Sequence, residues 1–156
     1  MASLSAGYIA FMGYFPASQI KLVTYGQPRV GDLAYANYID STIPFAYRVV
    51  HKDDMVPHLP PIWLEMGDWS NYTHHKSEIW YNNNMAVGQP YVECDVNESN
   101  QCSNQLEGNL FDLSTIDHDY YFNISVGFSV DGCPNYNPGG RASHVGETRH
   151  KFMLKH

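Results

Sequence analysis

Basic residues are scarce in this chain of 156 residues. Lysine and arginine number nine against sixteen aspartates and glutamates, which gives a formal net charge of −7. Four of the nine basic residues lie after position 140, so the preceding part of the chain is strongly acidic. Proteins that bind nucleic acid need clustered lysine and arginine to neutralise phosphates. The composition therefore argues against a nucleic-acid surface on the main body of the chain.

The chain also lacks a long apolar run. Residues 1–20 carry no charge, but glycine, serine and tyrosine dilute them, Pro16 interrupts them and no basic start precedes them. These features fit a transmembrane segment or a signal peptide poorly, although a cryptic signal peptide stays as the alternative. We predict an amphipathic helix with small residues on one side. Its apolar stripe consists of Leu4, Tyr8, Phe11, Met12 and Phe15.

Cysteine is rare, and no Cys, His and Asp spacing matches a structural zinc site. The adjacent His74 and His75 would point to opposite faces of a strand and would make a poor metal pair. We therefore expect no cofactor and no metal, with a site at these histidines as the weaker alternative.

The segment 22–50 has the pattern of a βαβ unit. A β-rich run from Leu22 stops at Gly26, and Asp32 can then cap a helix. An apolar run follows at 45–50. We predict two parallel neighbouring strands joined by a right-handed crossover. Further strands are predicted at 76–81 and 91–93, with an aromatic loop at 62–71.

The stretch Tyr47–Pro61 (YRVVHKDDMVPHLPP) has the pattern of a buried strand, followed by two aspartates and a proline-rich loop. Asp53 and Asp54 come where the strand would end. Chemistry in open α/β sheets collects beyond the carboxyl ends of the strands, so a carboxylate there is a candidate for catalysis. Three prolines fix the loop that follows. A solvated acidic pair at a turn is the alternative.

Three motifs in this order resemble the fungal-type, or class 3, lipases: Thr24–Gly31 (TYGQPRVG), Tyr47–Pro61 and Asp117–Phe122 (DHDYYF). The resemblance covers about residues 2–133. It implies an α/β fold, namely the C-terminal part of an α/β-hydrolase sheet with parallel strands and crossover helices, which we expect to be incomplete. We predict a lipase-like domain at 1–133 and a linker with a mildly basic, disordered tail at 134–156.

Carried over by motif, the resemblance makes Asp54 the acid of a catalytic triad and His118 its base. Their order along the chain agrees with the Ser, Asp, His order of α/β-hydrolases. His58, four residues after Asp54, is the main rival for the base. The family's nucleophile lies in a Gly-x-Ser-x-Gly turn between a strand and a helix, and these 156 residues contain no such pattern. Residues 2–10 resemble the helix that follows that turn.

Several features favour a secreted or lumenal parent protein. The glycosylation pattern Asn-x-Ser/Thr occurs at Asn71, Asn97 and Asn123. A Cys94–Cys102 disulfide would close a short polar loop, and the resemblance implies a disulfide in about this place. Cys133 is then left over, and we expect its partner in a missing N-terminal part. Three reduced cytosolic thiols are the alternative.

The resemblance implies hydrolysis of acylglycerols or other lipid esters at a lipid–water interface by a Ser-His-Asp mechanism. Because the serine is missing, we expect this chain to be inactive by itself. One alternative is a catalytically inactive lipase-like fragment that binds lipid or a partner. Another is a glycosylated interaction module without enzymatic activity.

Overall fold

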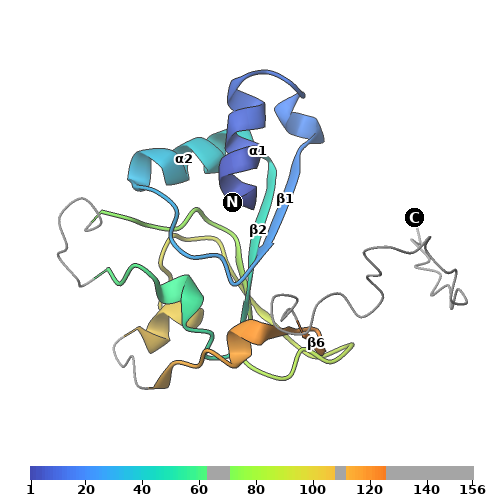
Figure 1. Ribbon diagram of the computed structural model, residues 1–156, viewed down its shortest axis with the longest axis vertical. Helices are drawn as coiled ribbons and strands as arrows, with labels where there is room; N and C mark the ends of the chain where they lie inside the picture. Colours follow the sequence, from blue (N-terminus) through green and yellow to red (C-terminus); the bar gives the residue numbers. More distant parts are fainter. Residues whose placement is uncertain (63–70, 108–111, 126–156) are drawn as a thin grey trace, which may run out of the picture. The chain divides into compact units, whose positions relative to one another are not determined.

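A computed structural model describes residues 1–62, 71–107 and 112–125 (Figure 1). The chain divides into the units Met1–Val126 and Gly127–His156, and all described residues belong to the first. Most of the predicted aromatic loop, Cys133 and the predicted tail at 134–156 lie outside the described residues. The predicted domain boundary therefore stays a prediction.

A four-stranded sheet forms the centre of the described part, in the order β1-β2-β3-β4. Strands β1 (Lys21–Tyr25), β2 (Phe45–His51) and β3 (Glu78–Tyr81) are mutually parallel, whereas β4 (Val92–Cys94) runs antiparallel to β3. The predicted parallel pair is present as β1 and β2, and the strand predicted at 91–93, for which no direction was predicted, is β4. A parallel return needs a crossover of about a dozen residues or more, and only residues 82–91 join these strands.

The predicted βαβ unit is present as β1, helix α2 (Leu33–Thr42) and β2. The Asp32 carboxylate caps α2, because its Oδ1 accepts a hydrogen bond of 2.9 Å from the backbone N–H of Tyr35. Ile39 and Ile43 are fully buried and pack with Leu22 of β1. Figure 1 shows α2 leading into the start of β2, where Ile39 and Ile43 pack against Ala46.

The predicted N-terminal helix is present as α1 (Ala2–Phe11), but its small side chains face inward. Ser3, Ala6 and Gly7 are buried, and the Ser3 hydroxyl lies 2.8 Å from the Tyr35 hydroxyl. The predicted apolar stripe is exposed, reaching 75% at Phe11. Small residues let α1 approach α2 closely: a methyl group on Gly7 would lie 3.1 Å from Ile39 Cδ1. Close packing therefore decides which side of α1 is buried.

Two further apolar clusters complete the described core. One contains Val50, Trp80 and the disulfide-bonded Cys94 and Cys102. The other, formed by Val49, Met85 and Tyr121, lies next to the candidate site. No helix among the described residues is long and apolar enough to span a membrane.

Candidate active site

The first part of the site is the loop that follows β2. Asp54 is completely buried there. Its Oδ1 accepts a hydrogen bond of 2.9 Å from the backbone N–H of Val56. The loop also pairs with a later segment, because Ser114 N–H donates to Asp53 C=O and Met55 N–H donates to Ser114 C=O. This pairing brings the segment that leads to His118 beside Asp54.

The second part is the short helix η6 (Asp117–Asp119), which carries His118. The His118 Nδ1 lies 3.1 Å from Asp54 Oδ1 and 3.0 Å from Asp54 Oδ2. His51 supports this helix, since its Nδ1 lies 3.1 Å from the Asp117 carbonyl. The structure thus brings together two residues that are far apart in the sequence. An imidazole with Nδ1–H on a carboxylate keeps Nε2 available to accept a proton.

A third side chain completes the hydrogen bonds of Asp54. The Tyr121 hydroxyl donates to Asp54 Oδ2 over 2.6 Å. Burial and the adjacent Asp54 charge raise the pKa of Tyr121 well above its ordinary value, so the phenol stays protonated and donates. Tyr121 belongs to β5 (Tyr120–Tyr121), which pairs with β6 (Ile124–Ser125). Sequence reasoning missed Tyr121, although it lies in the quoted DHDYYF motif.

Gly26 lets the turn after β1 pass directly over the acid and the base. Its φ is +57°, and its N–H donates to Val49 C=O. A methyl group there would lie 2.6 Å from His118 Nδ1 and 2.7 Å from Asp54 Oδ2. Only glycine fits both this backbone conformation and this contact. The TYGQP motif contained Gly26, but its contact with His118 is not visible in the sequence.

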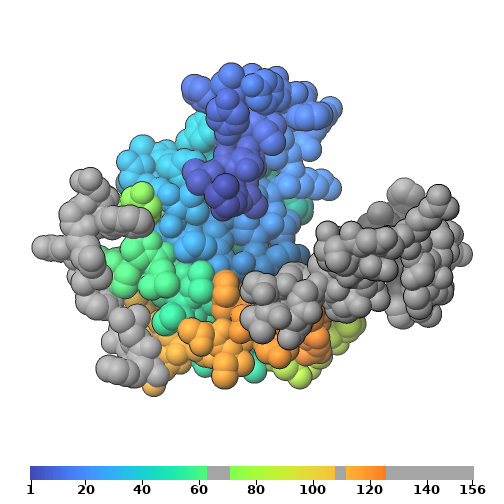
Figure 2. All heavy atoms as spheres, in the orientation of Figure 1, coloured from blue at the N-terminus to red at the C-terminus, as the bar shows by residue number. Residues whose placement is uncertain are grey.

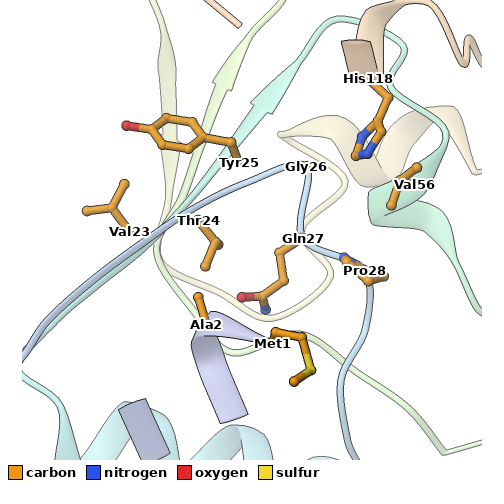
Figure 3. A pocket seen from close by; sticks show the side chains of 10 residues that line it. All are labelled: Met1, Ala2, Val23, Thr24, Tyr25, Gly26, Gln27, Pro28, Val56 and His118. Atoms are coloured by element: carbon orange, nitrogen blue, oxygen red, sulfur yellow. The ribbon is translucent and has the colours of Figure 1, made fainter. Parts of the chain in front are cut away.

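A cavity of about 390 Å³ opens beside His118 (Figure 3). The C-terminal end of β1, the turn after it and the N-terminus of α1 form much of its wall. The His118 side chain is 35% exposed, whereas that of Asp54 is not exposed at all. The base therefore faces an open space while the acid behind it is shielded from water. This arrangement suits proton transfer to or from a group in the cavity.

The rival histidines have other surroundings. His58 is buried, and burial lowers its pKa. The buried His74 lies with Nε2 2.8 Å from the Pro57 carbonyl, and burial lowers its pKa strongly. Burial also lowers the pKa of His75 to about 4. Among the described residues, His118 is the histidine that bonds to Asp54.

A buried ion cluster fixes the remainder of the acid loop. The Arg29 guanidinium bonds to both carboxylate oxygens of Glu98 and, at 2.6 Å, to Glu107. It also donates to Pro60 C=O, and its backbone N–H donates to Leu59 C=O. Burial opposes charge on Glu98, but Arg29 lowers its pKa on balance. Sequence reasoning assigned no role to Arg29, which joins the turn after β1 to the loop of Asp54.

The other predicted site residues are distributed around this core. Cys94 and Cys102 form a disulfide. Asn71 and Asn123 are exposed, and Asn123 lies in the turn between β5 and β6. Asn97 is half-buried, with its amide donating to the His74 carbonyl over 2.6 Å. No group of three or more His, Cys, Asp or Glu side chains in the described ranges could hold a metal ion.

Comparisons with known proteins agree on one family. The family model Lipase (class 3) matches residues 1–63. A lipase of Caenorhabditis elegans, ZK262.3, is 34% identical over 159 residues, covering 85% of this chain and 44% of that protein. Secreted mono- and diacylglycerol lipase 1 of Fusarium solani is 32% identical over 123 residues, covering 78% of this chain and 34% of that protein.

Comparison with solved structures identifies the same family. The triacylglyceride lipase of Rhizomucor miehei matches with a TM-score of 0.65 and 35% identity, covering 80% of this chain and 44% of that one. The chain thus spans less than half the length of each of these proteins. The mixed sheet with its helices is a partial α/β-hydrolase fold. This chain belongs to the class 3 lipases, of the α/β-hydrolase type.

Proposed function

We propose that this chain supplies the acid and the base of a serine ester hydrolase that acts on acylglycerols. The observation that carries the proposal is the His118 imidazole, bonded through Nδ1 to the buried Asp54 and bordering a cavity. A serine in that cavity would pass its proton to His118 Nε2 as it attacks the ester carbonyl. His118 would then return the proton to the leaving alkoxide.

Asp54 has a supporting role in this mechanism. Its carboxylate holds His118 in the tautomer that presents a free Nε2, and it stabilises the imidazolium that forms during proton transfer. Tyr121 and the Val56 N–H orient the carboxylate from the other side. The R. miehei relative is described as a triacylglyceride lipase and the F. solani relative as a mono- and diacylglycerol lipase. Both names support a lipid ester at a lipid–water interface as the substrate.

Site-directed substitution in the complete parent enzyme tests the proposal. We expect His118→Ala and Asp54→Asn to lower ester hydrolysis, measured with an emulsified triacylglycerol, by about 10⁴-fold. Asp53→Asn is the matched control, because it removes the neighbouring charge without touching the hydrogen bonds of Asp54. Turnover near the wild-type rate after His118→Ala would refute the assignment.

A lipase-like chain that binds lipid or a partner without catalysis is the second candidate. The absence of Gly-x-Ser-x-Gly from the 156 residues favours it. A serine-directed fluorophosphonate separates the two candidates. Labelling of the folded complete parent supports the hydrolase, whereas lasting failure to label supports the binding protein.

We also propose that the parent protein is secreted. The F. solani relative is named as secreted, and the Cys94–Cys102 disulfide fits an oxidising compartment. The exposed Asn71 and Asn123 are the favoured glycan acceptors, because the Asn97 amide is already engaged with a carbonyl. Removal of N-glycans from protein secreted by a eukaryotic host should lower its apparent mass, and Asn123→Gln should remove part of that shift.

A further inference from the structure

The segment that carries His118 has little regular structure of its own. Helix η6 has three residues, none of them buried, and the strands β5 and β6 that follow have two residues each. Figure 2 shows the orange atoms of this segment at the surface of the molecule. A helix this short cannot fix its orientation through its own hydrogen bonds. The direction of the His118 imidazole therefore depends on contacts with neighbouring elements.

One such contact comes from His51, the last residue of β2. His51 is buried, and its Nδ1 lies 3.1 Å from the carbonyl oxygen of Asp117. A carbonyl oxygen only accepts hydrogen bonds, so Nδ1 carries the proton and donates it. The peptide group that joins Asp117 to His118 is planar and includes the N and Cα atoms of His118. A hydrogen bond to its carbonyl oxygen therefore also restrains the backbone of the base.

Asp117 is bound through its backbone N–H as well. This N–H donates to the Ser114 hydroxyl over 3.1 Å. Ser114 in turn pairs with both neighbours of Asp54, because its N–H donates to Asp53 C=O and its C=O accepts from Met55 N–H. The backbone before the base is thus held at two points. His51 supplies the one that lies nearer to the base along the chain.

His51 contacts the acid and the phenol beside it too. Its backbone C=O accepts a hydrogen bond of 3.0 Å from the Asp54 N–H. Its ring packs edge-on against the Tyr121 ring, with centroids 5.8 Å apart and planes at 64°. The Tyr121 hydroxyl donates to Asp54 Oδ2. One residue at the end of β2 therefore contacts the acid, its phenol partner and the peptide group of the base.

The second ring nitrogen of His51 shows which of these contacts requires a histidine. Nε2 is buried, and among the described residues it has no hydrogen-bond partner. A buried polar atom without a partner costs about 1–3 kcal/mol. Phenylalanine at this position would avoid that cost and would keep both the ring contact with Tyr121 and the backbone C=O. Only the hydrogen bond from Nδ1 to Asp117 depends on the imidazole.

We propose that His51 is a positioning residue for ester hydrolysis. Its Nδ1–H holds the Asp117–His118 peptide group, so that the His118 imidazole lies between Asp54 and the cavity. His51 is not among the described residues that line the cavity (Figure 3), so it acts through His118 rather than on the substrate. The catalytic part of this role rests on the proposed function, because it needs His118 as the base.

Two substitutions separate the hydrogen bond from the ring contact. His51→Phe keeps a ring and removes the donor, whereas His51→Asn removes the ring and keeps an N–H donor close to the position of Nδ1. Both are made in the complete parent enzyme and assayed with a water-soluble nitrophenyl ester. We expect His51→Phe to lower kcat by about 10–100-fold and to leave KM within about twofold, because a misplaced base slows the chemical step without weakening substrate binding. His51→Asn should keep most of the wild-type kcat.

His75→Phe is the matched control. The His75 Nδ1 also lies near a backbone carbonyl, that of Lys76 at 3.0 Å, and its Nε2 is likewise buried without a partner in the described part of the chain. Lys76 precedes β3 and does not carry the base, so His75→Phe should leave kcat unchanged. A wild-type kcat in His51→Phe would overturn the inference, and so would equal losses in His51→Phe and His51→Asn. A loss in His51→Phe that matches its unfolded fraction, measured by circular dichroism, would show a purely structural role and also overturn it.

Nuclear magnetic resonance of the full 156-residue chain, labelled with ¹⁵N-histidine, tests the contact apart from hydrolysis. The His118 Nδ1 proton should lose its hydrogen-bonded shift in His51→Phe and keep it in His51→Asn, and an intact signal in both variants would overturn the inference. An inactive His118→Ala enzyme beside a fully active His51→Phe enzyme would support the proposed function and refute the positioning role. Full activity of His118→Ala would refute the proposed function, and the His118 signal would then decide whether His51 holds the peptide group.

Discussion

The substitution Gly26→Ala offers a direct test of the geometry around His118. The added methyl carbon would lie 2.6 Å from His118 Nδ1, whereas ordinary contact begins at 3.4 Å. The imidazole or the turn must therefore move by about 0.8 Å. Because Nδ1 now lies 3.0 Å from Asp54 Oδ2, displacement of the ring would stretch this bond beyond hydrogen-bonding range.

The expected loss of stability has two parts. Alanine at a φ of +57° costs about 1–2 kcal/mol relative to glycine. Loss of a hydrogen bond to a charged group costs about another 1.5–3 kcal/mol. We therefore expect Gly26→Ala to lower the free energy of unfolding by about 2.5–5 kcal/mol. Gly13→Ala is the matched control, because Gly13 has a φ of +68° and nothing near its added methyl group.

Urea unfolding of the full chain measures the two losses side by side. Gly13→Ala should show the backbone cost alone, about 1–2 kcal/mol. Nuclear magnetic resonance of ¹⁵N-labelled histidine reports the bond itself, and the His118 Nδ1 proton should lose its hydrogen-bonded shift only in Gly26→Ala. Equal losses of stability in the two variants, with that signal intact, would refute the close approach of Gly26 to the acid and the base.

Three further predictions concern the surroundings of the site. Tyr121→Phe should lower the free energy of unfolding in urea by about 1.5–3 kcal/mol, because the Asp54 carboxylate loses a hydrogen bond. Tyr120→Phe, at an exposed position, is the control, and equal losses in the two variants would contradict a bond between Tyr121 and Asp54. Because burial lowers the pKa of His75 to about 4, the unfolded chain binds the proton first as the pH falls below 6.5. The contribution of His75 should thus lower the free energy of unfolding by about 3 kcal/mol between pH 6.5 and pH 4. His75→Gln should remove this contribution, and a variant that loses as much stability as the wild type over this pH range would contradict the prediction. Replacing Cys94 and Cys102 by serine should lower the free energy of unfolding by about 2–3 kcal/mol, because the disulfide closes a loop of eight positions. An unchanged urea midpoint would contradict a stabilising role of the disulfide.

Local patterns predicted much of the βαβ unit. Asp32 before a helical repeat is a strong capping signal, and the structure confirms both the cap and the parallel strands around it. The motifs also placed Asp54 at a strand end, and the structure brings it to His118. The order of the three motifs predicted that Asp54 and His118 act together, because composition alone cannot pair two residues that lie so far apart in the sequence.

Tertiary packing decided what the sequence could not. The apolar stripe of α1 predicted the helix but not the buried side, because Gly7 and Ala6 permit a close approach that larger residues forbid. The pattern at 91–93 predicted a strand but not its direction, and the short connection of residues 82–91 favours the antiparallel pairing of β4 with β3. The partners Tyr121 and Gly26 emerge only when the turn after β1 and the hairpin of β5 and β6 meet in space.

The Arg29 cluster has a consequence for the conditions in which this protein works. Glu98 lies within the ring of chain that the Cys94–Cys102 disulfide closes, and Arg29 ties Glu98 to the carbonyl groups that follow Asp54. Reduction of the two sulfurs would remove the covalent restraint on the loop that carries Glu98, and Arg29 and the His74 N–H would alone hold its carboxylate in place. The disulfide and the loop of Asp54, forty residues earlier in the chain, are thus joined through a single guanidinium group.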